Sequence, residues 1–140
     1  MQHFLSCLLA VLMLCTPLLG SARADEPMPC ASNYFHSARV TASASGGGTI
    51  SMTFSAIGLD VCDRIGVTTY TIERQNDDGS WTTVAGPFGG ATASGVVSYS
   101  FSRNYTVSAN GTYRVAAVFT CAFGIGSEAR RVVSNSVVVN

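Results

Sequence analysis

Hydrophobic and polar residues follow two different patterns along this chain. Residues 4–19 form an almost continuous apolar run. Further along, apolar and polar residues alternate in short segments that are separated by Gly, Asn and Asp. A two-residue alternation predicts β-strands with one buried face, whereas no stretch of a dozen residues after the apolar run has the 3.6-residue period of a helix. The sequence therefore predicts a leading segment followed by an all-β domain.

The apolar run predicts a secretory signal peptide over residues 1–24. It is shorter than the span of about 20 residues that a transmembrane helix needs. It ends in Ala22-Arg23-Ala24, which fits the small-x-small cleavage pattern. Residues 1–3 lack the Lys or Arg that is usual in a signal peptide. An uncleaved anchor is the alternative interpretation of the run. We expect a secreted, extracellular protein, with residues 25–33 as an N-terminal arm and residues 34–140 as the folded domain.

Seven short strands are predicted in the folded domain, over residues 34–45, 50–56, 67–75, 81–85, 97–107, 113–119 and 132–139. Glycine-containing turns separate several of them, including Gly46-Gly47-Gly48, Asp78-Gly79 and Asn110-Gly111. Residues 58–65, 86–95 and 121–129 are predicted as loops. Short strands with regularly spaced turns are typical of a single antiparallel, seven-stranded β-sandwich.

Composition excludes several functional classes. Only 11% of the residues are charged, the formal net charge is zero, and all eight basic residues are Arg. A nucleic-acid-binding protein would show a basic excess. No second apolar run follows the signal peptide, so we expect no membrane contact after its cleavage.

Candidates for catalytic chemistry are few. His36 is the one His after residue 24, and alternation places it on an exposed strand face. Asp60 with Asp63, or Asp77 with Asp78, could form the carboxylate pair of a glycoside hydrolase. Aspartates also stabilise turns, which explains the same residues without catalysis. One His and at most one unpaired Cys do not complete a zinc site. We therefore expect no enzymatic activity, no metal and no cofactor.

Several segments resemble parts of a fibronectin type III domain. They are Tyr70-Thr71-Ile72-Glu73-Arg74 (third strand), Asp78–Val84 (following hairpin), Gly111–Val118 (sixth strand with its corner tyrosine) and Gly126-Ser127-Glu128 (loop into the last strand). The second strand of that family usually carries a buried Trp, and this chain has Met52 and Phe54 instead. The resemblance implies an immunoglobulin- or fibronectin type III-like sandwich over about residues 34–139.

The chain also resembles small exported bacterial proteins of unknown function. The residues that carry this likeness are Gly47-Gly48 with Ile50 and Phe54, Asp63-Arg64-Ile65-Gly66, Asp78-Gly79-Ser80-Trp81, Tyr113 and Gly126-Ser127. The likeness implies a secreted single sandwich, and it implies no activity.

The fibronectin-like strand order also implies a disulfide. Cys30, Cys62 and Cys121 remain after removal of the signal peptide. In that order the third and sixth strands are antiparallel neighbours, with Cys62 entering the third and Cys121 ending the sixth. A Cys62–Cys121 bond would close a loop of about 60 residues and stabilise the fold by about 4 kcal/mol. Cys30–Cys62 and Cys30–Cys121 are the alternatives. An unpaired Cys30 is either a tolerated thiol or a site of intermolecular cross-linking.

Three residues are candidates for partner binding. Phe123 and Ile125 lie in a predicted loop at the pole that the disulfide would fix, and a rigid loop loses less entropy on binding. Their alternative role is packing against the end of the sandwich. Trp81 is either a contact for a protein or carbohydrate, or a cross-strand cover for Tyr70 or Ile72.

The overall hypothesis is a secreted, non-enzymatic β-sandwich module. It would bind an unknown extracellular protein or glycan through its pole loops. A secreted inhibitor or structural surface protein is the alternative, and a hydrolase that uses Asp60 or Asp63 is a third hypothesis.

Overall fold

The computed structural model describes residues 32–140, so the predicted signal peptide and most of the predicted arm, including Cys30, lie outside the described residues. The described part contains β-strands and no helix. Accordingly, none of its segments is a helix that could span a membrane. The strands are β1 (Phe35–Ala44), β2 (Thr49–Cys62), β3 (Arg64–Gln75), β4 (Trp81–Gly89), β5 (Thr92–Ala93), β6 (Val96–Thr106), β7 (Gly111–Phe123), β8 (Gly126–Val133) and β9 (Val137–Val139).

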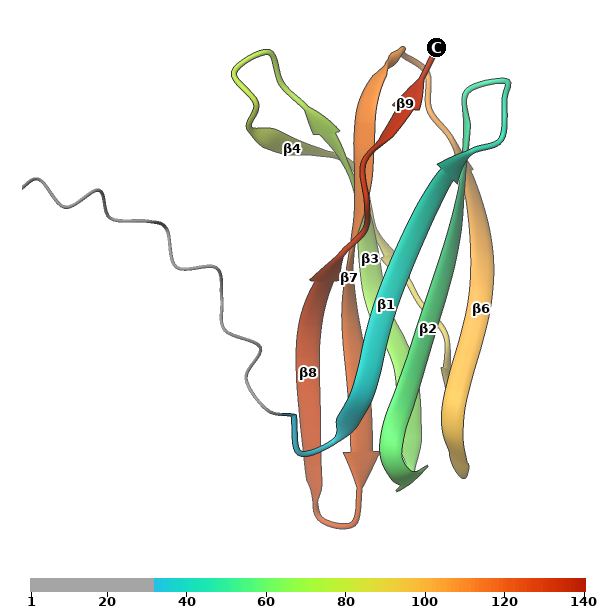
Figure 1. Ribbon diagram of the computed structural model, residues 1–140, viewed down its shortest axis with the longest axis vertical. Helices are drawn as coiled ribbons and strands as arrows, with labels where there is room; N and C mark the ends of the chain where they lie inside the picture. The colour runs from blue at the N-terminus through green and yellow to red at the C-terminus, as the bar shows by residue number, and fades with distance from the viewer. Residues whose placement is uncertain (1–31) are drawn as a thin grey trace, which may run out of the picture. The chain divides into compact units, whose positions relative to one another are not determined.

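Two antiparallel sheets pack face to face (Figure 1). The smaller sheet has the order β1-β2-β6. The larger sheet has the order β4-β3-β7-β8, with the short strands β5 and β9 pairing to β3 and β7. The prediction of an all-β, two-sheet fold is confirmed. The structure has nine strands where the sequence predicts seven. β5 is a short addition, and the predicted strand over residues 132–139 is wrong as a single strand, because residues 134–136 separate the end of β8 from β9.

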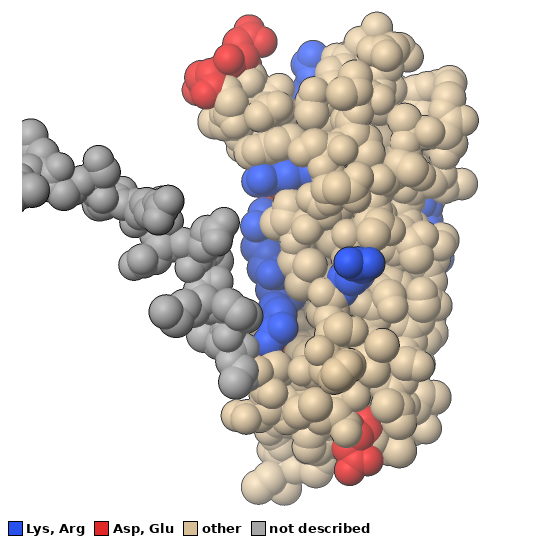
Figure 2. Space-filling model, viewed as in Figure 1, with Lys and Arg blue, Asp and Glu red and all other residues tan. Residues whose placement is uncertain are grey.

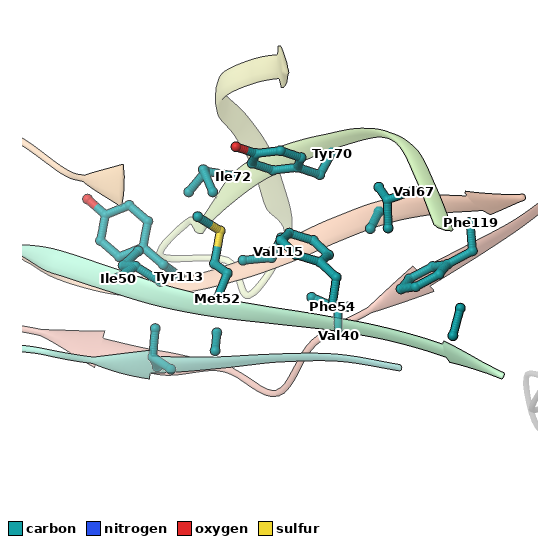
Figure 3. Close-up of a cluster of buried hydrophobic side chains, with 14 of the residues drawn as sticks. Val40, Ile50, Met52, Phe54, Val67, Tyr70, Ile72, Tyr113, Val115 and Phe119 are labelled. Carbon is teal, nitrogen blue, oxygen red and sulfur yellow. The ribbon is translucent and has the colours of Figure 1, made fainter. Parts of the chain in front are cut away.

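Alternate residues of the central strands form the core between the sheets (Figure 3). The fully buried side chains with the largest volumes are Tyr113, Phe54, Phe119, Ile50, Met52, Ile65, Ile72, Val67, Val115, Cys62 and Cys121. Met52 and Phe54 thus lie in the core at the place where the resemblance leads one to expect a Trp. Burying a side chain of this size stabilises the fold by about 1.5–3 kcal/mol.

A chain of aromatic rings closes the flank between the edge strands β4 and β6. Each ring centroid lies 4.8–5.8 Å from the next, in the order Tyr99, Phe101, Phe54, Tyr70, Phe88 and Tyr105. The chain of ring contacts crosses from one sheet to the other twice, at Phe54–Tyr70 and at Phe88–Tyr105. Aromatic pairs at such distances add attraction to their area burial. This flank is therefore held together by side chains from both sheets.

The predicted loop over residues 58–65 is wrong. β2 continues to Cys62, and β3 begins at Arg64. The backbone N–H of Leu59 donates to the carbonyl of Tyr34 at 2.9 Å, which keeps this part of β2 extended. The pairing register with β6 shifts between Ile57 and Cys62, so a bulge accounts for the interrupted alternation.

The predicted loops over residues 86–95 and 121–129 are also shorter than expected. β4 continues to Gly89 and β5 covers Thr92–Ala93, because backbone hydrogen bonds form even where glycine supplies no apolar side chain. β7 continues to Phe123 and β8 begins at Gly126, with Phe123 and Gly126 paired directly. Gly124 has φ +63°, which permits the two-residue turn that joins them.

Candidate functional site at the hairpin pole

One end of the sandwich is formed by the β2–β3 and β7–β8 turns. The Asp63 carboxylate accepts a hydrogen bond from the backbone N–H of Gly124 at 3.0 Å, which ties the two turns together. The ring of Phe123 lies 4.7 Å from the ring of Tyr34. Hence the tip of the β7–β8 hairpin is fixed by a hydrogen bond on one side and an aromatic contact on the other. We call this end the hairpin pole: Tyr34, Leu59, Val61, Asp63, Phe123, Gly124 and Ile125.

Aliphatic side chains are exposed at the hairpin pole. Ile125 is fully exposed at the tip of the turn, and Leu59 and Val61 of β2 are each 53% exposed. Phe123 is half-buried, since it packs against Tyr34. The two loop residues that the sequence singles out therefore have different environments. Ile125 is available for contact, whereas Phe123 mainly supports the hairpin.

The two described cysteines lie buried beneath this pole. The sulfur atoms of Cys62 and Cys121 are 2.9 Å apart, and both residues are free thiols. Cys62 ends β2, and Cys121 pairs with Ile65 across β3 and β7. Burial, followed by the neighbouring Cys62 thiol, raises the pKa of Cys121 to about 12. A group with so high a pKa stays a thiol at neutral pH, and thiols are poor nucleophiles compared with thiolates.

Trp81 lies far from the hairpin pole. It pairs with Gln75 at the end of β3, whereas Phe123 extends beyond Arg64 at the start of that strand. The separation along β3 is 11 residues, or about 36 Å at ~3.3 Å per residue. The structure therefore does not bring Trp81 together with Phe123 and Ile125.

The predicted packing of Trp81 over Tyr70 or Ile72 is wrong. Both of those side chains face the core, whereas the guanidinium of Arg114 lies 4.1 Å above the Trp81 ring on the outer face of the larger sheet. The cation–π contact replaces the expected cross-strand pair because Trp81 pairs with Gln75 rather than with an inward-facing residue.

Sequence reasoning missed an ion network beside Trp81. Glu73 is buried, and its carboxylate binds Arg114 Nε at 2.6 Å and Arg131 at 2.8 Å. Glu73 and Arg114 are direct partners across β3 and β7. The sequence did contain a signal for this pair. Glu73 and Arg114 are charged residues of opposite sign within two strands that the fibronectin type III resemblance makes neighbours. The network holds Arg114 over Trp81. The charged and aromatic side chains of this face therefore already contact one another.

The remaining candidates for catalysis serve as turn or surface residues. His36 is exposed, as predicted. The Asp60 carboxylate accepts from the N–H of Val61 at 2.7 Å, and Asp63 binds Gly124. The hydroxyl and backbone N–H of Ser80 donate to Asp78 and lower the pKa of that carboxyl. Within residues 32–140, no three His, Cys, Asp or Glu residues are grouped so that they could hold a metal ion.

A small cleft lies at the end opposite the hairpin pole. It has a volume of about 150 Å³ and is lined by Arg74, Val84, Tyr105, Val107, Ser108, Ala109 and Tyr113. The Arg74 guanidinium crosses one side to donate to the carbonyl of Asn110 at 2.8 Å.

Figure 2 shows acidic side chains at both ends of the domain and Arg side chains along the flank that carries β8.

Comparison of the chain with protein-family models, with curated proteins and with solved structures gives no match.

Proposed function

We propose that residues 34–140 form a non-enzymatic binding module that contacts an extracellular protein through the hairpin pole. The observation that carries the proposal is the fully exposed Ile125 on a hairpin that Asp63 and Tyr34 hold in place. An apolar side chain on an ordered turn loses little conformational entropy when a partner covers it. The pole therefore offers apolar area at a small ordering cost.

A protein partner suits this surface better than a glycan. The exposed groups are aliphatic, namely Ile125, Leu59 and Val61. Covering such groups releases water from apolar area, which is the main favourable term in protein association. Glycan recognition generally uses the open face of an aromatic ring, whereas the Phe123 and Tyr34 rings already contact each other.

We propose that the protein is secreted and that Cys62 and Cys121 form a disulfide in an oxidising compartment. Their sulfur atoms are already neighbours, so oxidation would require little movement of either strand. The bond would connect the end of β2 to β7 directly beneath the hairpin pole. It would thereby further limit the motion of the surface that we propose for binding.

We also propose that the sandwich is of the fibronectin type III kind. The three-stranded sheet β1-β2-β6 and the four-stranded core β4-β3-β7-β8 support this assignment. A second support is the hydroxyl of Tyr113, near the start of β7, which donates to the carbonyl of Ala109 at 2.6 Å. Such a tyrosine corner recurs in immunoglobulin-like sandwiches.

The test is a substitution at the tip of the pole. Ile125→Ser removes the exposed aliphatic group and leaves the hydrogen bond between Asp63 and Gly124 in place. Proteins from the medium in which the mature chain is produced are captured on immobilised wild type, and their affinities for both forms are then measured. Burying an Ile is worth about 1.5–3 kcal/mol, so we expect affinity to fall by about 10-fold or more.

Val138→Ser is the matched control. Val138 is 59% exposed and pairs with Thr112 at the other end of β7. We expect this variant to bind every partner as the wild type does. Partners that bind Ile125→Ser as tightly as the wild type, or that are lost equally from both variants, would show that the pole is not the binding surface.

A further inference from the structure

A groove separates the sheets on the flank opposite the aromatic chain. It has a volume of about 500 Å³ and is lined by Ala38–Thr41 of β1, by Val132 and Val133 of β8, and by Asn135. β1 is an edge strand of the smaller sheet, and β8 is an edge strand of the larger one. No backbone pairing joins these two strands in the part of the chain that the structure describes. We call this feature the flank groove.

Asn135 closes the upper end of the flank groove by imitating a neighbouring strand. Its side-chain oxygen accepts the backbone N–H of Ala42 at 3.0 Å, and its side-chain nitrogen donates to the carbonyl of Ala42 at 2.8 Å. A paired β-strand would make this same set of two bonds. The N–H and carbonyl of Ala42 therefore point away from β2, toward the edge.

The same backbone direction recurs at Val40 and Ala38. The register between β1 and β2 is unbroken from Ala38, opposite Ala56, to Ala42, opposite Met52. Because the pattern of strand hydrogen bonds repeats every two residues, Val40 and Ala38 direct their N–H and carbonyl groups to the same side as Ala42. No hydrogen bond to these outward groups occurs among residues 32–140. The flank groove thus presents two unpaired sets of strand donors and acceptors.

The other three long edge strands, β4, β6 and β8, carry features that oppose strand addition, and β9 is only three residues long. Pro87 lies in β4 and has no N–H to donate. Arg103 in β6 pairs with the buried Met52, so a charge stands on the inward side of that edge. In β8, Glu128 and Arg130 pair with the buried Cys121 and Phe119, so charges also stand on the inward side of this edge. Inward charges and proline are the usual protections of exposed edges. β1 has neither between Ala38 and Thr41.

The surroundings of the flank groove favour a negatively charged segment. Arg39 lines it and makes no ion pair within the described domain, whereas Arg130 and Arg131 of β8 bind Glu128 and Glu73. Figure 2 shows Arg side chains gathered along this flank, while the acidic side chains lie at the ends. A carboxylate opposite Arg39 would pair with the one cation of this flank that lacks a partner.

We propose that β1 binds an extended, acidic peptide segment by strand addition at residues 38–41. The segment pairs its backbone with Ala38 and Val40, directs apolar side chains into the flank groove, and places a carboxylate beside Arg39. This site is separate from the hairpin pole and does not depend on the function proposed for that pole.

Hydrogen exchange followed by NMR tests the proposal with a synthetic probe. The probe is acetyl-Thr-Val-Glu-Val-Thr-amide, whose Glu would stand opposite Arg39 in antiparallel pairing. In the free protein we expect the amides of Ala38 and Val40 to exchange much faster than that of Ala42, which Asn135 protects. The probe should slow exchange at Ala38 and Val40. Unchanged exchange at both amides with saturating probe would overturn the proposal.

Two controls separate backbone pairing from charge attraction. A probe with N-methylated valines retains its charge but lacks the pairing N–H groups, and it should not bind; equal binding would overturn strand addition. Arg39→Glu should weaken binding of the Glu probe about two- to fivefold and favour a Lys probe, whereas Arg103→Glu on β6 should change neither. If Arg103→Glu has the same effect as Arg39→Glu, the probe responds only to net charge and the proposed site is wrong.

Discussion

Replacement of Glu73 by Gln tests the ion network on the outer face of the larger sheet. Glu73 is 7% exposed and binds Arg114 at 2.6 Å and Arg131 at 2.8 Å. Gln retains the shape of the side chain, but it removes the negative charge that the two guanidinium groups share. Both cations would then lie beside a neutral amide that can accept with only one oxygen.

The expected loss of stability lies between two limits. Removing one member of a buried ion pair costs about 3–5 kcal/mol, whereas an exposed pair contributes about 0–1 kcal/mol. Arg131 is 55% exposed along its side chain and can regain water, but Arg114 is 24% exposed beneath its contact with Trp81. We therefore expect Glu73→Gln to lower the free energy of unfolding by about 2 kcal/mol, because one of the two cations remains poorly hydrated. This corresponds to a fall in Tm of roughly 6–10 °C.

Urea unfolding followed by circular dichroism measures this loss. Trp81 is the one Trp of the chain and lies 4.1 Å from the Arg114 guanidinium, so its fluorescence should also change in the folded variant. Glu128→Gln is the control, since the pair between Glu128 and Arg130 is more exposed and should contribute less than about 1 kcal/mol. Equal destabilisation by the two substitutions, with unchanged Trp81 fluorescence, would refute the reasoning.

Three further predictions concern single residues. Tyr113→Phe removes the hydroxyl bond of the corner and should cost about 1 kcal/mol in urea unfolding, whereas Tyr105→Phe, whose hydroxyl has no hydrogen-bond partner in the described domain, should cost almost nothing. In the reduced protein, the pKa of Cys121 is raised from 9.0 to about 12, so the unfolded chain loses this proton first and stability should fall as pH rises from 9 toward 12. Cys121→Ala should abolish that slope, and a slope that persists would assign it to another group. Gly66→Ala places a methyl group 2.8 Å from the Cα of Thr92 at φ +146° and should destabilise the fold by more than about 1 kcal/mol; Gly89→Ala, which meets open space, should not, and equal thermal stability of the two variants would contradict this.

Side-chain alternation predicted the strands that form the core. Met52 and Phe54, Tyr70 and Ile72, and the inward residues of β7 all lie where a two-residue period places them, because burial between two sheets requires one apolar face per strand. The same reasoning failed at residues 86–95 and 121–129, which it predicted as loops. There, glycines and a two-residue turn continue the backbone ladder without supplying a side-chain pattern.

The candidate sites were predictable only in part. The strand order that the fibronectin type III resemblance implies placed Phe123 and Ile125 at a pole near Cys62 and Cys121, and the structure places these residues at one end of the sandwich. It gave no sign of the contact between Asn135 and Ala42, which are 93 residues apart in sequence. Such contacts depend on which strand edges face each other across the two sheets. A single polar residue in a short connection, such as Asn135, does not indicate which edge it will face.

The two flanks of the sandwich differ in how they are closed, and this difference affects how the domain fluctuates. Between β4 and β6, six aromatic rings interlock the sheets. On the opposite flank, β1 is joined to the larger sheet by the Asn135 amide at one end and by the Arg130 guanidinium, 5.7 Å from the centroid of the Phe35 ring, at the other. Thermal fluctuations should therefore separate the sheets first on the amide-bridged side, with the aromatic side acting as the axis. Each such opening would briefly admit solvent to the core between β1 and β8. The core residues beside these strands should therefore show faster solvent access than those beside β4 and β6.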